Sequence, residues 1–92
     1  GVYGPLLERV RGCAYLIRGE FEDADKALDR SLDAARSSGS EFEVLLSLSA
    51  RGLLAHVRGE APAPDDVAET ESIAERLGID SLPPLMPAVL SV

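Results

Sequence analysis

The sequence contains no tryptophan, and aromatic residues make up only 4% of its 92 residues. A hydrophobic core must therefore be built from Leu, Val, Ile and Ala, which suits helices in close contact. Hydrophobic residues make up 46% of the chain, so a packed core is possible and disorder of the whole chain is disfavoured. A chain of this length forms at most one small domain.

Cysteine occurs once, at Cys13, so neither an internal disulfide nor a Cys-rich metal site can form. The sequence has no signal peptide and no run of 18 apolar residues, and we expect a cytoplasmic location. It begins with Gly1 rather than Met, which indicates a fragment of a larger protein. Lys is rare beside Arg, while Ala and Gly are abundant, which indicates a bacterial source with a GC-rich genome.

Positive charge is also scarce, because nine Lys and Arg residues oppose 16 Asp and Glu, giving a net charge of −7. Nucleic-acid binding requires basic residues that neutralise phosphates. Anionic membrane surfaces require basic residues as well. We therefore expect no nucleic-acid and no membrane partner. A helix-turn-helix interpretation fails for the same reason, because no helix has the basic face needed for recognition.

What the sequence does contain is an internal repeat with an offset of forty residues. Residues 11–20 read RGCAYLIRGE, and residues 51–60 read RGLLAHVRGE. Further along, Ala34 and Arg36 match Ala74 and Arg76 at the same offset. Two copies of one structural unit explain this match.

Apolar residues recur every three or four positions inside each unit, which predicts helices. The expected fold class is all-α: two tandem antiparallel helical hairpins, at about 5–38 and 40–78, within a module of residues 1–79. In the first helix the stripe expected to face the core is Leu6, Val10, Cys13 or Ala14, and Ile17. In the second helix the stripe is Phe21, Ala24, Leu28, Leu32 and Ala35.

The helices of the second unit have terminal signals. Ser40 and Glu43 match a capping box, in which Ser40 is the N-cap and the Glu43 side chain reaches back to it. Asp66 and Glu69 are a second candidate pair, expected to open the last helix, and Gly78 is typical of a C-cap. In the helix that follows Ser40, Leu48 and Leu54 add apolar surface outside the main apolar face, so we expect this helix to be buried on more than one side.

Residues 80–92 form an apolar, Pro-rich tail in which regular structure should be broken. At the forty-residue offset, Leu82, Leu85 and Met86 correspond to apolar residues at the start of the preceding unit. We expect the tail to be the degraded start of a third unit that caps the stack, because terminal repeats are commonly atypical.

Seven residues of the first unit have the spacing of a known repeat family: Gly12, Tyr15, Gly19, Phe21, Ala24, Leu28 and Ser31. Residues 19–24, GEFEDA, resemble the "G-D-Y-E-E-A" turn of tetratricopeptide repeats. The resemblance covers about residues 5–79. It implies a right-handed solenoid of helix pairs that approach most closely at Gly12 and Ala24. The second unit departs from the family pattern, because Ala55 replaces the aromatic residue and a Pro-rich loop is inserted. The period of 40 rather than about 34 is similar to that of helical repeats in large bacterial signalling ATPases, regulators and cyclases.

Members of this family bind peptides or protein segments on a concave face formed by the first helix of each pair. The resemblance implies that the candidate partner-binding face here is Arg9, Cys13, Leu16, Ser49, Leu53 and His56. Only Arg9 matches the residues with which the family clamps a C-terminal carboxylate, so no such clamp is expected. The face is mostly apolar, which favours an apolar partner or packing against neighbouring repeats.

No catalytic or metal-binding pattern is present. His56 has no nucleophile or carboxylate partner nearby in sequence, and Cys13 lies on an apolar stripe, where a buried thiol is the ordinary role. The acidic residues at 20–25 open a helix and lack the spacing of an EF-hand loop. The sequence also lacks a Gly-rich phosphate loop and zinc-ligand spacing. We therefore expect no catalytic residue, no cofactor and no metal.

The function predicted from the sequence is a non-catalytic protein–protein interaction or scaffold module of a larger bacterial signalling or regulatory protein. Its partner would be a protein or peptide, or neighbouring repeats of the same chain. The alternative is a structural cap or self-association element of the parent protein, with a homo-oligomer formed through the apolar tail.

Overall fold

The computed structural model describes residues 4–78, and these form four helices with no strand among them. The all-α prediction is therefore confirmed. The predicted tail at residues 80–92 lies outside the described residues. The helices are α1 (Gly4–Ile17), α2 (Phe21–Ser38), α3 (Glu41–Val57) and α4 (Pro64–Leu77).

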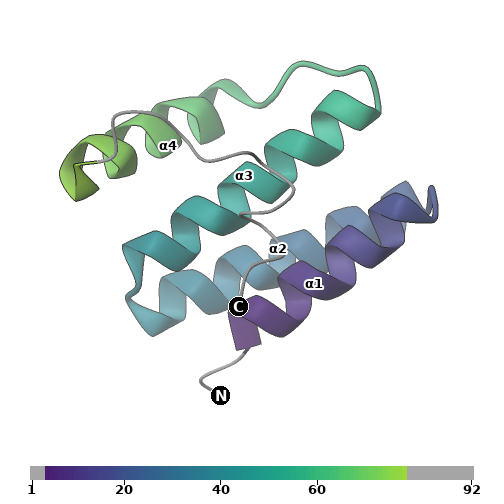
Figure 1. The fold of residues 1–92 in the computed structure, drawn as a ribbon, viewed down its shortest axis with the longest axis horizontal. Coiled ribbons are helices and arrows are strands. Elements are labelled where there is room, and N and C mark those ends of the chain that lie inside the picture. The colour runs from purple at the N-terminus through teal and green to yellow at the C-terminus, as the bar shows by residue number, and fades with distance from the viewer. Residues whose placement is uncertain (1–3, 79–92) are drawn as a thin grey trace.

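Consecutive helices run in opposite directions (Figure 1). We call α1 and α2 the first hairpin, and α3 and α4 the second hairpin. The helix α3 lies against both helices of the first hairpin. The backbone of α4 lies close to that of α3 but not to those of α1 and α2. Figure 1 shows the result as a stack, with the first hairpin at one edge, α3 in the middle and α4 at the opposite edge.

The helix ends follow the local signals in the sequence with two corrections. The Ser40 side chain caps α3 by accepting a hydrogen bond from the Glu43 N–H at 3.2 Å. Glu43 does not reach back as predicted, because its carboxylate accepts a hydrogen bond from Arg9 of α1 at 2.6 Å. The helix α4 begins at Pro64 rather than at the predicted Asp66, because Pro suits the first helical position.

Glycine ends the second helix of each hairpin. Gly39 and Gly78 both have a left-handed backbone, with φ of 74° and 72°, a conformation that only Gly adopts without strain. In each case the glycine N–H donates to a carbonyl of the last helical turn. The predicted C-cap at Gly78 is therefore confirmed.

The core consists of two clusters that share α2 and α3. The first joins α1, α2 and α3, and the second joins α2, α3 and a single buried residue of α4, Ile73. The predicted core stripe of α2 is confirmed, and α3 is buried on more than one side as expected. The first cluster contains Cys13, Leu16, Ala24, Leu28, Ala50 and Leu54. The second contains Leu32, Ala35, Val44, Leu45, Leu48 and Ile73.

The prediction for the core face of α1 is largely wrong. The predicted residues Val10, Ala14 and Ile17 are exposed, and Ile17 keeps 69% of its surface. The inner face of α1 is instead made of small residues and one paired charge: Pro5, Arg9, Gly12, Cys13 and Leu16. Small and charged residues have low hydropathy. A prediction from hydropathy alone therefore favours the more apolar stripe of α1 as the core face.

A buried hydroxyl pair fixes the junction of α1, α2 and α3. The Ser31 hydroxyl donates to the Pro5 carbonyl oxygen at 2.9 Å and lies 2.7 Å from the Ser47 hydroxyl. Both serines are fully buried. Their polar atoms are satisfied, so burial costs little, and the geometry orders the three helices relative to one another.

Within residues 4–78, every helix is too short or too polar to span a bilayer.

Candidate functional site

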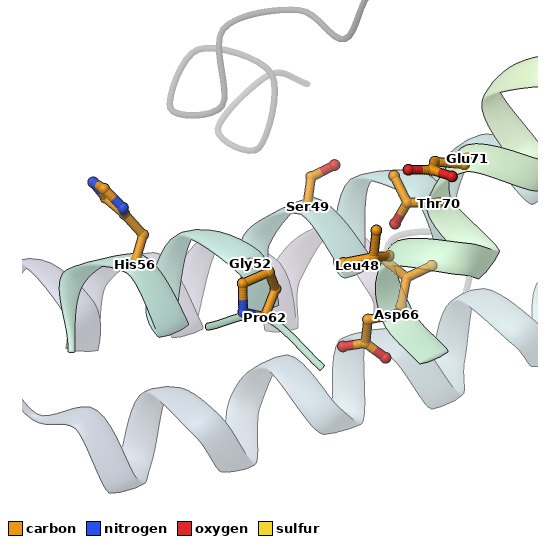
Figure 2. A pocket seen from close by; sticks show the side chains of 9 residues that line it. Leu48, Ser49, Gly52, His56, Pro62, Asp66, Thr70 and Glu71 are labelled. Atoms are coloured by element: carbon orange, nitrogen blue, oxygen red, sulfur yellow. The ribbon is translucent and has the colours of Figure 1, made fainter. Parts of the chain in front are cut away.

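A groove opens between the two helices of the second hairpin. Its volume is about 450 Å³, and its surface is mostly apolar. Figure 2 shows Ser49 and His56 along one side of α3, with Thr70 and Glu71 facing them from α4. We use "the groove" for the space lined by Leu48, Ser49, Gly52, His56, Pro62, Asp66, Val67, Thr70 and Glu71. A volume of this kind accommodates several side chains of a bound segment.

The forty-residue repeat explains where the groove lies. Five of its nine lining residues are the counterparts of residues that are buried in the first hairpin. The first hairpin packs those residues in its interior and against α3, whereas the second hairpin leaves their counterparts around an open groove. The buried residues are Arg9, Gly12, Leu16, Ala27 and Ser31, and their counterparts are Ser49, Gly52, His56, Val67 and Glu71.

The two helical glycines show the difference most directly. A Cβ atom at Gly12 would lie 2.5 Å from Cδ2 of Leu28, so α1 and α2 are in close contact there. The close approach predicted at Gly12 is therefore confirmed. A Cβ atom at Gly52 would meet nothing within 4 Å. The counterpart of Leu28 is Ala68, which is exposed and does not cover Gly52.

Ion pairs hold α4 in place with little apolar burial. Arg36 of α2 forms a two-pronged hydrogen bond with Glu69 of α4, at 2.7 and 2.8 Å. This bond is the main reason that the pKa of Glu69 is lowered and that of Arg36 is raised. Two turns further along the same side of α4, Arg76 donates to Glu41 of α3 at 2.9 Å.

Two of the residues that line the groove are acidic. Asp66 and Glu71 line it, and we call these two residues the acidic rim. Asp66 is partly neutralised by Arg51, whose Nε lies 3.3 Å from its carboxylate. The same guanidinium lies 3.9 Å from Asp29 of α2. Burial and the neighbouring Asp25 raise the pKa of Asp29, and Arg51 opposes this rise.

The predicted partner-binding face is divided by the structure. Arg9, Cys13 and Leu16 are buried, so the first hairpin presents none of these three side chains to a partner. These three residues lie on the face of α1 that points into the molecule. Leu53 is half-buried against the first core cluster. Ser49 and His56 line the groove, and these two alone among the predicted residues do so.

Burial makes Cys13 and Arg9 structural residues. Desolvation raises the pKa of the Cys13 thiol, and the Arg9 charge partly opposes this. A thiol with a raised pKa is a poor nucleophile at neutral pH. Arg9 pairs with Glu43 and so links α1 to α3.

Sequence reasoning missed the α4 side of the groove, which is formed by Asp66, Val67, Thr70 and Glu71. A signal was present, because applying the forty-residue offset to the second helix of the first unit leads from Ala27 and Ser31 to Val67 and Glu71. The family pattern directed attention to the first helix of each pair instead.

Within residues 4–78, His, Cys, Asp and Glu form no group of three that could hold a metal ion. In the same part of the chain, His56 is exposed and has no hydrogen bond or ion pair to another side chain. No protein-family model, no curated protein and no solved structure matches the chain.

Proposed function

We propose that the chain is a non-catalytic protein–protein interaction module that binds an amphipathic helix of its partner in the groove between α3 and α4. The observation that carries the proposal is the packing of α3 on the first hairpin. There α3, itself a helix, contacts Arg9, Leu16 and Ser31, the counterparts of Ser49, His56 and Glu71 in the groove. Within residues 4–78, no further helix lies against the groove in this way.

The chemistry of the groove favours a particular kind of helix. Its apolar lining suits a stripe of apolar residues spaced three or four apart, as in other helix-in-groove complexes. Asp66 and Glu71 favour basic residues beside that stripe. The net charge of −7 opposes nucleic acids and anionic membranes as competing partners.

The wider assignment follows from the sequence. The repeat and the GEFEDA turn support tetratricopeptide-like hairpins, taken from a larger cytoplasmic protein of bacterial signalling or regulation. The alternative is a cap or self-association element. That alternative relies on the apolar tail at residues 80–92, which lies outside the described residues.

The proposal is tested with a panel of synthetic amphipathic helical peptides, some flanked by Arg and others by Glu. Binding is followed by the amide chemical shifts of the chain in solution, at concentrations where it is monomeric. We expect Arg-flanked peptides to bind more tightly and to shift the amides of Ser49, Gly52, Val67 and Thr70.

A blocked variant locates the binding. Gly52→Leu places a side chain in the open space above Gly52 and should weaken peptide binding at least about tenfold, because the apolar contact is already occupied. Ser37→Leu adds the same side chain at an exposed position of α2, away from the groove, and should leave binding unchanged. Peptides that bind equally well to the Gly52→Leu variant would contradict the proposal.

A further inference from the structure

An exposed apolar stripe runs along the outer side of α1. Leu7 and Ile17 keep 60% and 69% of their surface, and Val10 and Ala14 between them are also exposed. These four residues are spaced by three, four and three positions, so they lie on one side of the helix. We call them the α1 stripe. A continuous apolar stripe on a solvent-facing helix marks a contact surface.

The repeat indicates what kind of contact this is. Forty residues further on, Leu7, Val10 and Ala14 correspond to Ser47, Ala50 and Leu54 of α3, which are all buried. Through these residues α3 packs on the first hairpin, since Ala50 and Leu54 belong to the first core cluster. Ser47 contacts Ser31 of α2. Three of the four residues of the α1 stripe thus correspond to the face with which α3 docks, whereas Ile17 corresponds to Val57, which is exposed.

Part of the groove corresponds to the surface that receives α3, because Ser49, His56 and Glu71 are the counterparts of Arg9, Leu16 and Ser31, which contact α3. The chain therefore carries both sides of one type of contact, and the first hairpin and α3 form it within the chain. Among residues 4–78, the α1 stripe and the groove do not contact each other: α1 is at one edge of the stack in Figure 1, and the groove lies between α3 and α4, toward the opposite edge.

The charges beside these two surfaces are complementary. Arg11 is exposed next to the α1 stripe, where it also pairs with Glu8. Its counterpart Arg51 in α3 lies near Asp29 of α2. The counterpart of Asp29 is Glu69, one turn from the acidic rim of the groove. A helix docked in the groove as α3 docks on the first hairpin would bring Arg11 close to these carboxylates.

We propose that the α1 stripe of one copy of the chain docks in the groove of a second copy. This inference rests on the proposed function and names its partner. The contact joins two different surfaces, so it is head-to-tail and each copy keeps one open half. Association therefore continues beyond the dimer as concentration rises.

Two variants of the full 92-residue chain disable one surface each. Val10→Glu places a charge on the α1 stripe and Gly52→Leu fills the groove, and neither position is buried in the monomer. Phe42→Glu is the matched control, because Phe42 is an exposed apolar residue outside both surfaces. Circular dichroism and thermal unfolding confirm that all three variants are folded as the parent chain is.

Sedimentation velocity over a wide range of concentrations gives the result. We expect the parent chain and Phe42→Glu to form species larger than a dimer, and the other two variants each to associate at least about tenfold more weakly. A 1:1 mixture of Val10→Glu and Gly52→Leu should form a dimer and stop there. In that mixture one variant retains the groove and the other retains the stripe.

Three results would overturn the inference: a parent chain that stays monomeric, one that stops at a dimer, or growth that is unchanged in both variants. The peptide experiment above separates this failure from that of the proposed function. Peptide binding in the groove together with a monomeric chain would leave the proposed function standing and remove the second copy as partner. If no peptide binds and the chain stays monomeric, both proposals are wrong.

Discussion

The two hairpins share a set of identical residues at the forty-residue offset and reach different packing. Each has the same Arg and Gly spacing along its first helix and a glycine turn at the same position. In the first hairpin, Leu28 covers Gly12 and the two helices close. In the second, the counterpart of Leu28 is Ala68, and Gly52 faces open space.

The connecting loop adds to this difference. In the first hairpin, α2 begins at Phe21, directly after the turn, and runs for 18 residues. In the second, α4 does not begin until Pro64 and runs for 14 residues. A proline in a loop favours extended backbone before it, so the helix is delayed and shortened. A smaller side chain at position 68 and a Pro-rich loop thus accompany the change from a closed helix pair to a groove.

Truncation of one core side chain and one groove side chain should give the largest contrast between the hairpins. Leu28→Ala removes a fully buried side chain and should lower the free energy of unfolding by about 2–5 kcal/mol. Val67→Ala shortens an exposed side chain that lines the groove and should lower the free energy of unfolding by less than about 1 kcal/mol. Urea unfolding measures both. Equal losses would mean that the second hairpin is packed as tightly as the first.

Loss of the buried hydroxyl should come next in size. Ser31→Ala leaves the Ser47 hydroxyl buried without its partner and should lower the free energy of unfolding by about 1–2 kcal/mol. The counterpart change, Glu71→Ala, affects an exposed residue and should stay within about 0.5 kcal/mol. The double variant Ser31→Ala/Ser47→Ala should lose less than the sum of the two single variants, and a strictly additive result would speak against a coupled pair.

The matched glycines should respond in opposite directions. Gly12→Ala forces the new Cβ against Leu28 and should lower the free energy of unfolding by a net amount of about 1–2 kcal/mol, after the gain in helix propensity. Gly52→Ala meets no atom and should raise it by about 0.5–1 kcal/mol. Thermal unfolding of the two variants side by side checks the sign. A loss at both glycines would contradict the open groove.

The smallest effect concerns the ion pair that anchors α4. The pKa of Glu69 is lowered by its hydrogen bond with Arg36, so its contribution to stability is present above the ordinary carboxyl pKa of about 4.3 and is lost as pH falls through the lowered value. Because the pair is partly exposed, we expect about 0.5–1 kcal/mol. The parent chain should lose this much more than Glu69→Gln between pH 7 and acid.

Asp29 provides a control of opposite sign for that experiment. Its pKa is raised, chiefly by burial, so its contribution is present at low pH and is lost as pH rises through the raised value. Relative to the parent chain, Asp29→Asn should therefore gain stability on going from acid to neutral pH. The same direction of change for Asp29→Asn and Glu69→Gln would show that these two carboxylates are wrongly described.

The helices of this fold could be predicted from the sequence, but the orientation of α1 and the site could be predicted only in part. Local signals such as Ser40 and Gly78 act within one turn, so they mark the helix ends correctly. The face that α1 turns inward depends on distant partners, namely Leu28 against Gly12 and Glu43 against Arg9. No pattern within α1 contains that information.

Only the α3 side of the candidate site could be predicted from the sequence, for a related reason. Ser49 and His56 were found because a repeat pattern identifies equivalent positions on the first helices. The α4 side was missed because the groove arises from a contact that is absent. Position 68 holds Ala, whereas the corresponding position of the first hairpin holds Leu28. The sequence shows that this difference matters only once Leu28 is known to pack on Gly12.

The central claim is that the groove of the second hairpin is an open counterpart of the surface covered by α3. Amide hydrogen exchange of the 92-residue chain, compared between dilute and concentrated solution, tests this claim most directly. In dilute solution we expect α2 to exchange only through global unfolding and α4 to exchange through easier local opening. On concentration, the amides of α4 and α1 should become more protected while those of α2 do not change. Equal protection of α2 and α4 in dilute solution, with no change on concentration, would contradict the account.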